Sequence, residues 1–366
     1  MENKKISWKT IILIVGSYMS FYIGSGFATG QENLQSYACY GLSGILSLLI
    51  SVVILIIVMH ACMKIGAETK LTSQSEIFAY FGGKWIGKFF DWYTFIFVFL
   101  LFGILISGGG ATINTLTGLP TWAGNLILSL LSIACVVLGL NRMVDIIGAL
   151  GPVLTVIILI VCVMGLVNAD EGIIAGNAAV QQLDILKAYP NWFISGIMTV
   201  AAYTCTGLAC LPAFARTMKG CGSRDIRIVT VLGPVCFELA VALTSLCMLA
   251  NISEVYDAQI PLLVIASRIS SVLGVLVGVM ICVALFTTVT PLLYSCTAKF
   301  AQDGTMKFRV LAIVIGIAGA YGGSLLPFGT LINIIFPLSG YISFIMLVAV
   351  IICVIRKKGF TSPEAE

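Results

Sequence analysis

The sequence predicts an all-α integral membrane protein whose ten transmembrane helices form two five-helix halves. Three observations predict this fold: a strongly apolar composition, ten segments long enough to cross a membrane, and a glycine-containing motif of the first segment that returns in the sixth. The 366 residues are 59% hydrophobic and 10% charged, with a mean hydropathy of +1.08. This composition is far from that of soluble globular proteins and indicates one transmembrane domain over residues 1–366.

Each predicted transmembrane segment contains roughly the 20 apolar residues that a helix needs to cross hydrocarbon. The segments cover residues 9–37, 41–64, 86–116, 120–140, 144–168, 191–217, 225–250, 260–299, 307–325 and 328–355. We expect the first half to occupy residues 9–168 and the second half residues 191–355, followed by a cytoplasmic tail over 356–366.

Basic residues predict the orientation, because Lys and Arg are enriched in cytoplasmic segments. If the N-terminus is cytoplasmic, every Lys and Arg falls on or beside a cytoplasmic segment except Lys187 and Arg268. The sequence therefore predicts a multi-pass protein of the plasma membrane with both termini in the cytoplasm. The formal charge of +4 reflects this topology and does not indicate nucleic-acid binding.

Residues 24–32, Gly-Ser-Gly-Phe-Ala-Thr-Gly-Gln-Glu, interrupt the first segment with three glycines and end in a carboxylate. Glycine is a poor helix former, and free backbone polar groups at membrane depth need protein or a water-filled cavity around them. A broken helix beside a solute site is the first interpretation. The second is a cleaved signal peptide, because basic, apolar and small residues follow one another here in the appropriate order.

A second copy of the motif favours the broken helix over the signal peptide. Residues 25–28, Ser-Gly-Phe-Ala, are echoed by residues 206–209, Thr-Gly-Leu-Ala, in the sixth segment. Because each half has an odd number of helices, the second half crosses the membrane in the opposite sense, which is an inverted repeat. Pro212 weakens helical continuity further. We therefore expect the first and sixth helices to be broken at the midplane.

Broken helices present unpaired N–H groups that suit an anion and unpaired carbonyls that suit a cation. A small amino acid or a related zwitterion fits such a site. We expect the N–H groups of residues 27–29 to face its carboxylate, and carbonyls of residues 24–26 and 203–207 to face its ammonium. The predicted substrate-binding residues are Gly24, Ser25, Gly26, Phe27, Ala28, Thr29, Tyr203, Thr204, Thr206 and Gly207.

The Gly-Ser-Gly triplet, the Thr-Gly pair in the sixth segment and the ten helices in two halves resemble the amino acid, polyamine and organocation superfamily, with its leucine-transporter-type fold. The longer string over residues 24–32 resembles the YkvI-like membrane proteins within it. The resemblance covers essentially the whole chain. It implies transport of a small solute by alternating access.

The resemblance also implies a sodium site between the first and eighth helices. Thr287 and Thr288 match its pair of adjacent hydroxyls, and the carbonyls of Ser20 and Ile23 would complete a set of hard oxygen ligands. The alternative is that both threonines bond to their own helix. Residues 144–167 lack the lysine that replaces sodium in some proton-coupled relatives. We expect no cofactor other than a coupling sodium ion.

Two carboxylates lie inside predicted spans, where ionisable groups are costly and therefore candidates for function. Glu32 is expected to pair with Arg268 as an outer gate, and Glu238 is the candidate to carry a coupled proton. For each, the alternative is a structural hydrogen bond.

Other functions find little support in the sequence. It contains no nucleotide-binding, His-Glu-x-x-His or Gly-x-Ser-x-Gly motif, so an enzyme is not expected. The single His60 and the scattered cysteines fit structural roles. Gly108, Gly109 and Gly110 are expected to pack helices closely. The sequence predicts a sodium-coupled secondary transporter whose partners are a small-molecule solute and the lipid bilayer; a proton-coupled transporter, or a solute sensor without net transport, is the alternative.

Overall fold

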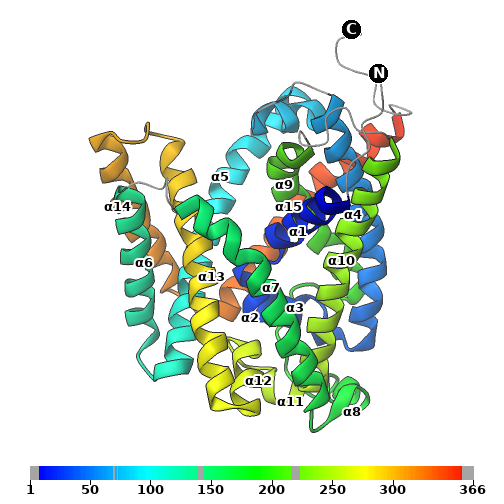
Figure 1. Ribbon diagram of the computed structural model, residues 1–366, viewed down its shortest axis with the longest axis vertical. Helices are drawn as coiled ribbons and strands as arrows, with labels where there is room; N and C mark the ends of the chain where they lie inside the picture. The colour runs from blue at the N-terminus through cyan, green and yellow to red at the C-terminus, as the bar shows by residue number, and fades with distance from the viewer. Residues whose placement is uncertain (1–7, 69–70, 72, 139–142, 216–222, 357–366) are drawn as a thin grey trace.

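The computed structural model describes residues 8–68, 71, 73–138, 143–215 and 223–356, and within these ranges all regular elements are helices. Figure 1 shows a helical bundle in which α8, α11 and α12 lie at one end, named here the α8 end. The elements are α1 (Trp8–Tyr22), α2 (Ser25–Thr29), α3 (Gln31–Ser36), η1 (Ala38–Tyr40), α4 (Leu42–Glu68), α5 (Gln74–Thr117), α6 (Thr121–Leu138), α7 (Met143–Val167), α8 (Gly172–Ala179), α9 (Trp192–Ala215), α10 (Ser223–Ala250), α11 (Ile252–Val255), α12 (Pro261–Ile269), α13 (Ser271–Ala298), α14 (Met306–Gly323) and α15 (Phe328–Arg356).

The described chain is that of a multi-pass membrane protein. Seven of its described helices are long and apolar enough to cross a membrane, and the number rises to eight if α7 and α8, bent by 88° at their junction, form one span. The described parts of α1 and α9 are apolar but shorter. The all-helical membrane class is thus confirmed, whereas the total of ten spans stays a prediction.

The first segment is broken, as its glycines predict. Helix α1 ends at Tyr22, α2 covers only five residues, and Gly30 separates α2 from α3 with a φ of 82°. This left-handed conformation is one that glycine adopts without steric cost. The chain therefore changes direction twice inside the bundle before α4 begins.

The predicted break of the sixth segment is wrong. Helix α9 continues from Trp192 to Ala215 through Thr206 and Gly207. The hydroxyl of Thr204 donates to the Val200 carbonyl at 2.8 Å, and that of Thr206 donates to the Tyr203 carbonyl at 3.1 Å. These hydroxyls bond within the helix that the motif was expected to interrupt, and a single glycine weakens a helix without obliging it to break.

The eighth segment is also divided, which the sequence reading did not foresee. Residues 260–299 form two helices, α12 and α13, separated at Ser270 by extended backbone with φ −163° and ψ 137°. Pro261 starts α12, where its missing N–H costs no hydrogen bond. Because of this break, Arg268 belongs to the short helix α12, which lies at the α8 end (Figure 1).

Helices of the two predicted halves pack against each other throughout the bundle. Helix α4 packs on α9, α5 on α13 and α1 on α10. Helices α5 and α14 approach so closely that a Cβ added to Gly323 would lie 2.2 Å from the Gly103 carbonyl oxygen. Only glycine fits there, and such small-residue contacts are the usual way in which membrane helices associate.

Substituting Gly323 tests this packing. We expect Gly323→Ala to destabilise the protein by about 1–3 kcal/mol, because the new methyl group must push α5 and α14 apart. Gly322→Ala is the matched control, since a Cβ there meets nothing within 4 Å. The measurement is thermal unfolding of the purified variants in detergent. Equal melting temperatures for the two variants would contradict the close contact.

Candidate functional site

The junction of α2 and α3 is held by the side chain of Thr29. Its hydroxyl donates to the Gly26 carbonyl at 2.7 Å and accepts the Gln31 backbone N–H at 3.3 Å. Thr29 is completely buried. It therefore links the two short helices across Gly30 and does not lie on a cavity wall.

A cavity of about 280 Å³ lies beside the interruption, between α1, α2, α3, α5, α9, α13 and α15. This volume is near the lower end of the range for small-molecule pockets. Its wall is apolar and aromatic, with one carboxylate. The lining residues are Phe21, Tyr22, Gly24, Gly26, Phe27, Glu32, Phe97, Val98, Leu101, Leu105, Ala202, Tyr203, Thr206, Thr288, Leu292 and Phe336.

Half of the predicted substrate-binding set lines this cavity: Gly24, Gly26, Phe27, Tyr203 and Thr206. The others lie elsewhere. Ala28 faces a smaller apolar cavity beside α7, α12 and α13, while Thr29, Thr204 and Gly207 lie off the wall. The side chain of Ser25 is outside the described residues.

Glu32 places its carboxylate at the helix interruption. Its Oε1 accepts a hydrogen bond of 2.5 Å from the Tyr203 hydroxyl, and its Oε2 lies 3.1 Å from the point where a Cβ on Gly26 would stand. The residue is 6% exposed, and it lines the cavity. The absence of a side chain at Gly26 thus gives the carboxylate access to the cavity.

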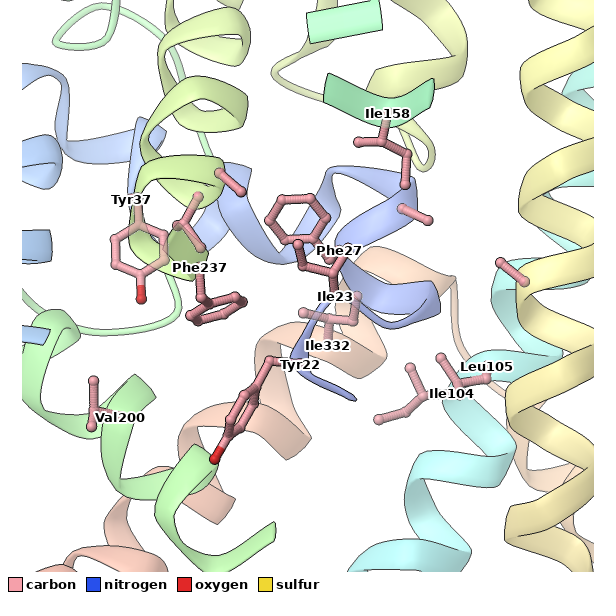
Figure 2. Close-up of a cluster of buried hydrophobic side chains, with 14 of the residues drawn as sticks. Tyr22, Ile23, Phe27, Tyr37, Ile104, Leu105, Ile158, Val200, Phe237 and Ile332 are labelled. Atoms are coloured by element: carbon pink, nitrogen blue, oxygen red, sulfur yellow. The ribbon is translucent and has the colours of Figure 1, made fainter. Parts of the chain in front are cut away.

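Aromatic rings connect this carboxylate to α1 and α10. The Tyr22 ring lies 5.3 Å from the rings of both Tyr203 and Phe237, and the Tyr22 hydroxyl donates to the Tyr203 carbonyl at 3.2 Å. Figure 2 shows Tyr22, Phe27 and Phe237 gathered around the interruption. Edge-on and tilted ring pairs of this kind stabilise a core beyond the area that they bury. The rings therefore hold the wall of the cavity rigid.

Glu238 lies behind this wall on α10 and is not a lining residue. It is 5% exposed, and neither carboxylate oxygen has a hydrogen-bond partner among the described residues. Its electrostatic neighbours are the hydroxyl groups of Tyr18, Tyr37 and Tyr203. A buried carboxylate in this condition is costly unless it is protonated or compensated by a cation.

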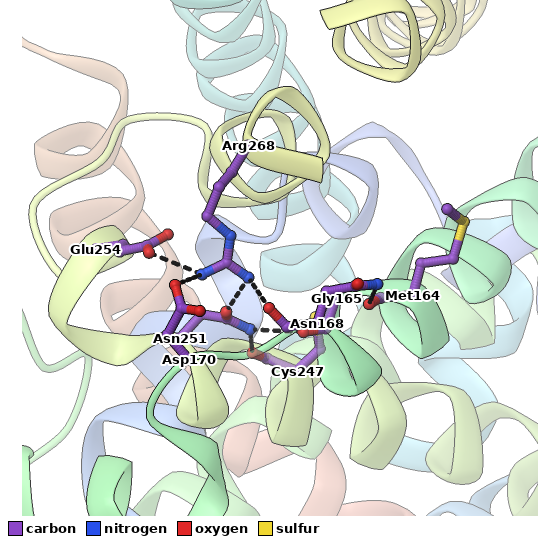
Figure 3. A network of polar contacts seen from close by, with 8 residues as sticks. All are labelled: Met164, Gly165, Asn168, Asp170, Cys247, Asn251, Glu254 and Arg268. Carbon is purple, nitrogen blue, oxygen red and sulfur yellow. Dashed lines mark hydrogen bonds and ion pairs between the residues drawn. The ribbon is translucent and has the colours of Figure 1, made fainter. Parts of the chain in front are cut away.

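The predicted gate between Glu32 and Arg268 is wrong. The Arg268 guanidinium lies 2.7 Å from a Glu254 oxygen and 3.6 Å from one of Asp170. It also donates to the Asn168 carbonyl at 2.9 Å and to the Asn251 side chain at 2.6 Å (Figure 3). The break at Ser270 turns α12 toward α11 and the α7–α8 junction, so Arg268 meets acceptors there.

Side-chain amides, of which Gln35 is buried and Gln259 and Asn333 are partly exposed, link α3 to its neighbours on the side of the α8 end. Gln35 donates to the Gly329 carbonyl at 2.9 Å, and the Gly329 N–H donates to Gln259 at 2.8 Å. The Asn333 side-chain amide donates to the side-chain oxygen Oε1 of Gln35 at 3.1 Å. These bonds tie α3 to the start of α15 and to the segment before α12.

Thr287 and Thr288 both donate their hydroxyl hydrogens to the Ala284 carbonyl at 2.9 Å. Their lone pairs remain available, and Thr288 reaches the cavity wall. Helix α13 packs against α2. The backbone of Ser20 and Ile23 lies at the end of α1, next to the interruption; the Ser20 side chain is outside the described residues. This arrangement is compatible with a sodium site and does not test it.

Several residues that line the cavity were not predicted from the sequence. Phe97, Leu101 and Leu105 of α5, Leu292 of α13 and Phe336 of α15 are apolar residues in apolar helices. No pattern in such a helix says which face meets a cavity and which meets lipid. The apolar composition of these helices is therefore the reason why the sequence does not identify these lining residues.

The glycine triplet of α5 has the packing role that was expected. Added Cβ atoms at Gly108, Gly109 and Gly110 would collide with Phe328, Leu128 and Asn125 respectively. Among the described residues, no group of three or more His, Cys, Asp or Glu side chains is placed to hold a metal ion.

Comparison with known sequences finds relatives along almost the entire chain. The YyaD protein of Bacillus subtilis (strain 168) is 23% identical over 353 residues, which cover 96% of this chain and 97% of YyaD. The membrane protein YkvI of the same strain is 22% identical over 343 residues, covering 94% of this chain and 95% of YkvI. No protein-family model matches.

Solved structures settle the fold. MhsT in complex with L-phenylalanine aligns with a TM-score of 0.58 at 16% identity, over 94% of this chain and 89% of that chain. The chain has the leucine-transporter-type fold. A manganese transporter of Eremococcus coleocola, in complex with an aromatic bis-isothiourea substituted compound, aligns with a TM-score of 0.51 at 16% identity, over 97% and 74% of the two chains. These similarities concern the fold of the chain.

A double-mutant cycle tests the position of Arg268. We expect Arg268→Ala and Glu254→Ala to show a coupling of about 0.5–1 kcal/mol in the free energy of unfolding, since the pair is partly exposed. Arg268→Ala and Glu32→Ala should add within about 0.5 kcal/mol, because they share no contact. Denaturation of the three single and two double variants in mixed micelles, beside the unmodified protein, measures both values. A strong coupling energy between Arg268 and Glu32 would instead support the predicted outer gate.

Proposed function

We propose that the protein is a secondary active transporter that moves a small nitrogenous organic solute, an amino acid or a related amine, by alternating access. The solute site is the cavity at the interrupted first segment. The inverted repeat of residues 9–168 and 191–355, membership of the amino acid, polyamine and organocation superfamily and a plasma-membrane orientation with both termini in the cytoplasm belong to the same proposal.

One observation carries this proposal: a small-molecule cavity lies where the chain is interrupted inside the bundle, with Glu32 on its wall. Interrupted helices at a buried cavity are the construction that secondary transporters use for solute sites. The amide contacts on the α8 side of Glu32 tie α3 to the start of α15 and to the segment before α12. Opening this side requires those few hydrogen bonds to break.

Sodium is the proposed coupling ion, with ligands from the Ser20 and Ile23 carbonyls and the Thr287 and Thr288 hydroxyls. The support is the position of Thr288 on the cavity wall and the packing of α13 against α2. Proton coupling is the second candidate, and the observation that favours it is Glu238, whose buried carboxylate has no hydrogen-bond partner among the described residues.

Counterflow in proteoliposomes tests transport. Vesicles loaded with unlabelled amino acids and amines should accumulate labelled solute, and Gly26→Val should reduce this exchange by about tenfold or more, because the added side chain meets Glu32 at the cavity. Gly16→Val is the matched control on α1, where a Cβ meets nothing within 4 Å. Solute binding without exchange would indicate a sensor.

Sodium dependence tests the coupling ion. If the site is correct, replacing sodium by potassium abolishes concentrative uptake, and Thr288→Val raises the sodium concentration for half-maximal uptake about tenfold, the loss expected for one ligand worth about 1.4 kcal/mol. Thr290→Val is the control, because Thr290 is buried on the same helix and bonds to Phe286. Uptake that does not depend on sodium but is lost in the Glu238→Gln variant would favour proton coupling.

A further inference from the structure

We propose that the cavity selects an organic monocation: an amine with an apolar or aromatic body and no carboxylate. This proposal rests on the proposed transport function and narrows the substrate class of the same site. The cavity wall supports it by its charge, by its hydrogen-bond donors and by its rings.

The charge on the wall has one sign. Among the sixteen lining residues, Glu32 is the single carboxylic acid, and none is Lys, Arg or His. In a site of low dielectric, a carboxylate without a counter-ion is costly, whereas a bound ammonium group compensates it. A ligand carboxylate would find no cationic side chain on the wall.

The side-chain donors of the wall are already in use. Four lining residues carry a hydroxyl hydrogen, and each donates to an acceptor of the protein. These hydroxyl hydrogens are therefore not offered to a ligand carboxylate, whereas an ammonium brings its own donors. The four bonds run from Tyr22 to the Tyr203 carbonyl, from Tyr203 to Glu32, from Thr206 to the Tyr203 carbonyl and from Thr288 to the Ala284 carbonyl.

Backbone N–H groups at the start of α2 were the donors expected to hold a substrate carboxylate. The Ala28 N–H is taken by the Gly24 carbonyl at 3.0 Å. Glu32 Oε2 lies 3.1 Å from the Cβ position of Gly26, so a carboxyl group of the protein already stands at this end of α2. A second carboxylate placed there would face the first at close range and be repelled.

Aromatic rings form much of the remaining wall. Six of the lining residues are aromatic, contributed by α1, α2, α5, α9 and α15. A cation near ring faces gains attraction from their quadrupoles. The same rings provide the apolar contact for the body of the ligand. They are Phe21, Tyr22, Phe27, Phe97, Tyr203 and Phe336.

Three ligands with the same phenyl ring separate the effects of charge. Phenethylamine, L-phenylalanine and 3-phenylpropionate are titrated by calorimetry into the full-length protein in lipid nanodiscs, in sodium buffer. We expect phenethylamine to bind at least about tenfold more tightly than phenylalanine, a difference of about 1.4 kcal/mol, and phenylpropionate not to bind. Equal or tighter binding of phenylalanine overturns the proposal.

Variants assign the preference to Glu32. Glu32→Gln should lose the advantage of phenethylamine over phenylalanine, while Glu32→Asp keeps it, and Glu171→Gln, an exposed carboxylate of the loop before α8, leaves it unchanged. Melting temperatures check that each variant is folded. A folded Glu32→Gln variant that retains the preference contradicts the role of the carboxylate. If that variant does not fold, the ligand series on the unmodified protein still tests the proposal.

Different results would contradict the transport proposal and the assignment of the substrate to organic monocations. If none of the three ligands binds, and counterflow detects no exchange of other amines or amino acids, the transport proposal itself is lost. If amino acids bind and exchange but amines do not, transport stands and the assignment to monocations is wrong.

Discussion

The structure depends on one constraint: the interrupted first segment places polar side chains inside an apolar bundle, where a polar group without a partner is costly. Helix α3 is buried along its entire length although its residues are Gln, Glu, Asn, Leu, Gln and Ser. Other helices supply partners for Glu32 and Gln35, whereas Gln31 Oε1 and the Asn33 side-chain amide have none among the described residues. Tyr203, Gly329 and Asn333 provide partners for Glu32 and Gln35. The packing of α9 and α15 around α3 follows from this need.

The same constraint gives the bundle two unlike regions. On the α8 side of Glu32, amide and guanidinium groups join short helices through specific hydrogen bonds. On the other side, the cavity is lined by rings and aliphatic side chains. Polar contacts can be exchanged one for another, whereas apolar contacts depend on shape.

Local chemistry explains which sequence predictions held. The glycines of residues 24–30 predicted a break, and Gly30 adopts a left-handed conformation that other residues avoid. The Thr-Gly pair of the sixth segment lacked that requirement, because its threonines donate within the helix, and α9 continues. Arg268 was assigned to Glu32 because both were charged and expected on the same side. The break at Ser270 was not marked by a glycine, and the short helix that it creates places Arg268 beside Glu254.

The sequence by itself determined the membrane class, the interrupted first segment and the presence of carboxylates at membrane depth, because hydropathy, glycine conformation and charge are properties of single residues or short runs. The tertiary structure decided which of these groups meet. It placed Glu32 on a cavity with Tyr203 and left Glu238 behind the wall. It also chose which faces of α5, α13 and α15 line the cavity. In helices apolar on every side, only packing against neighbours distinguishes a lipid face from a binding face.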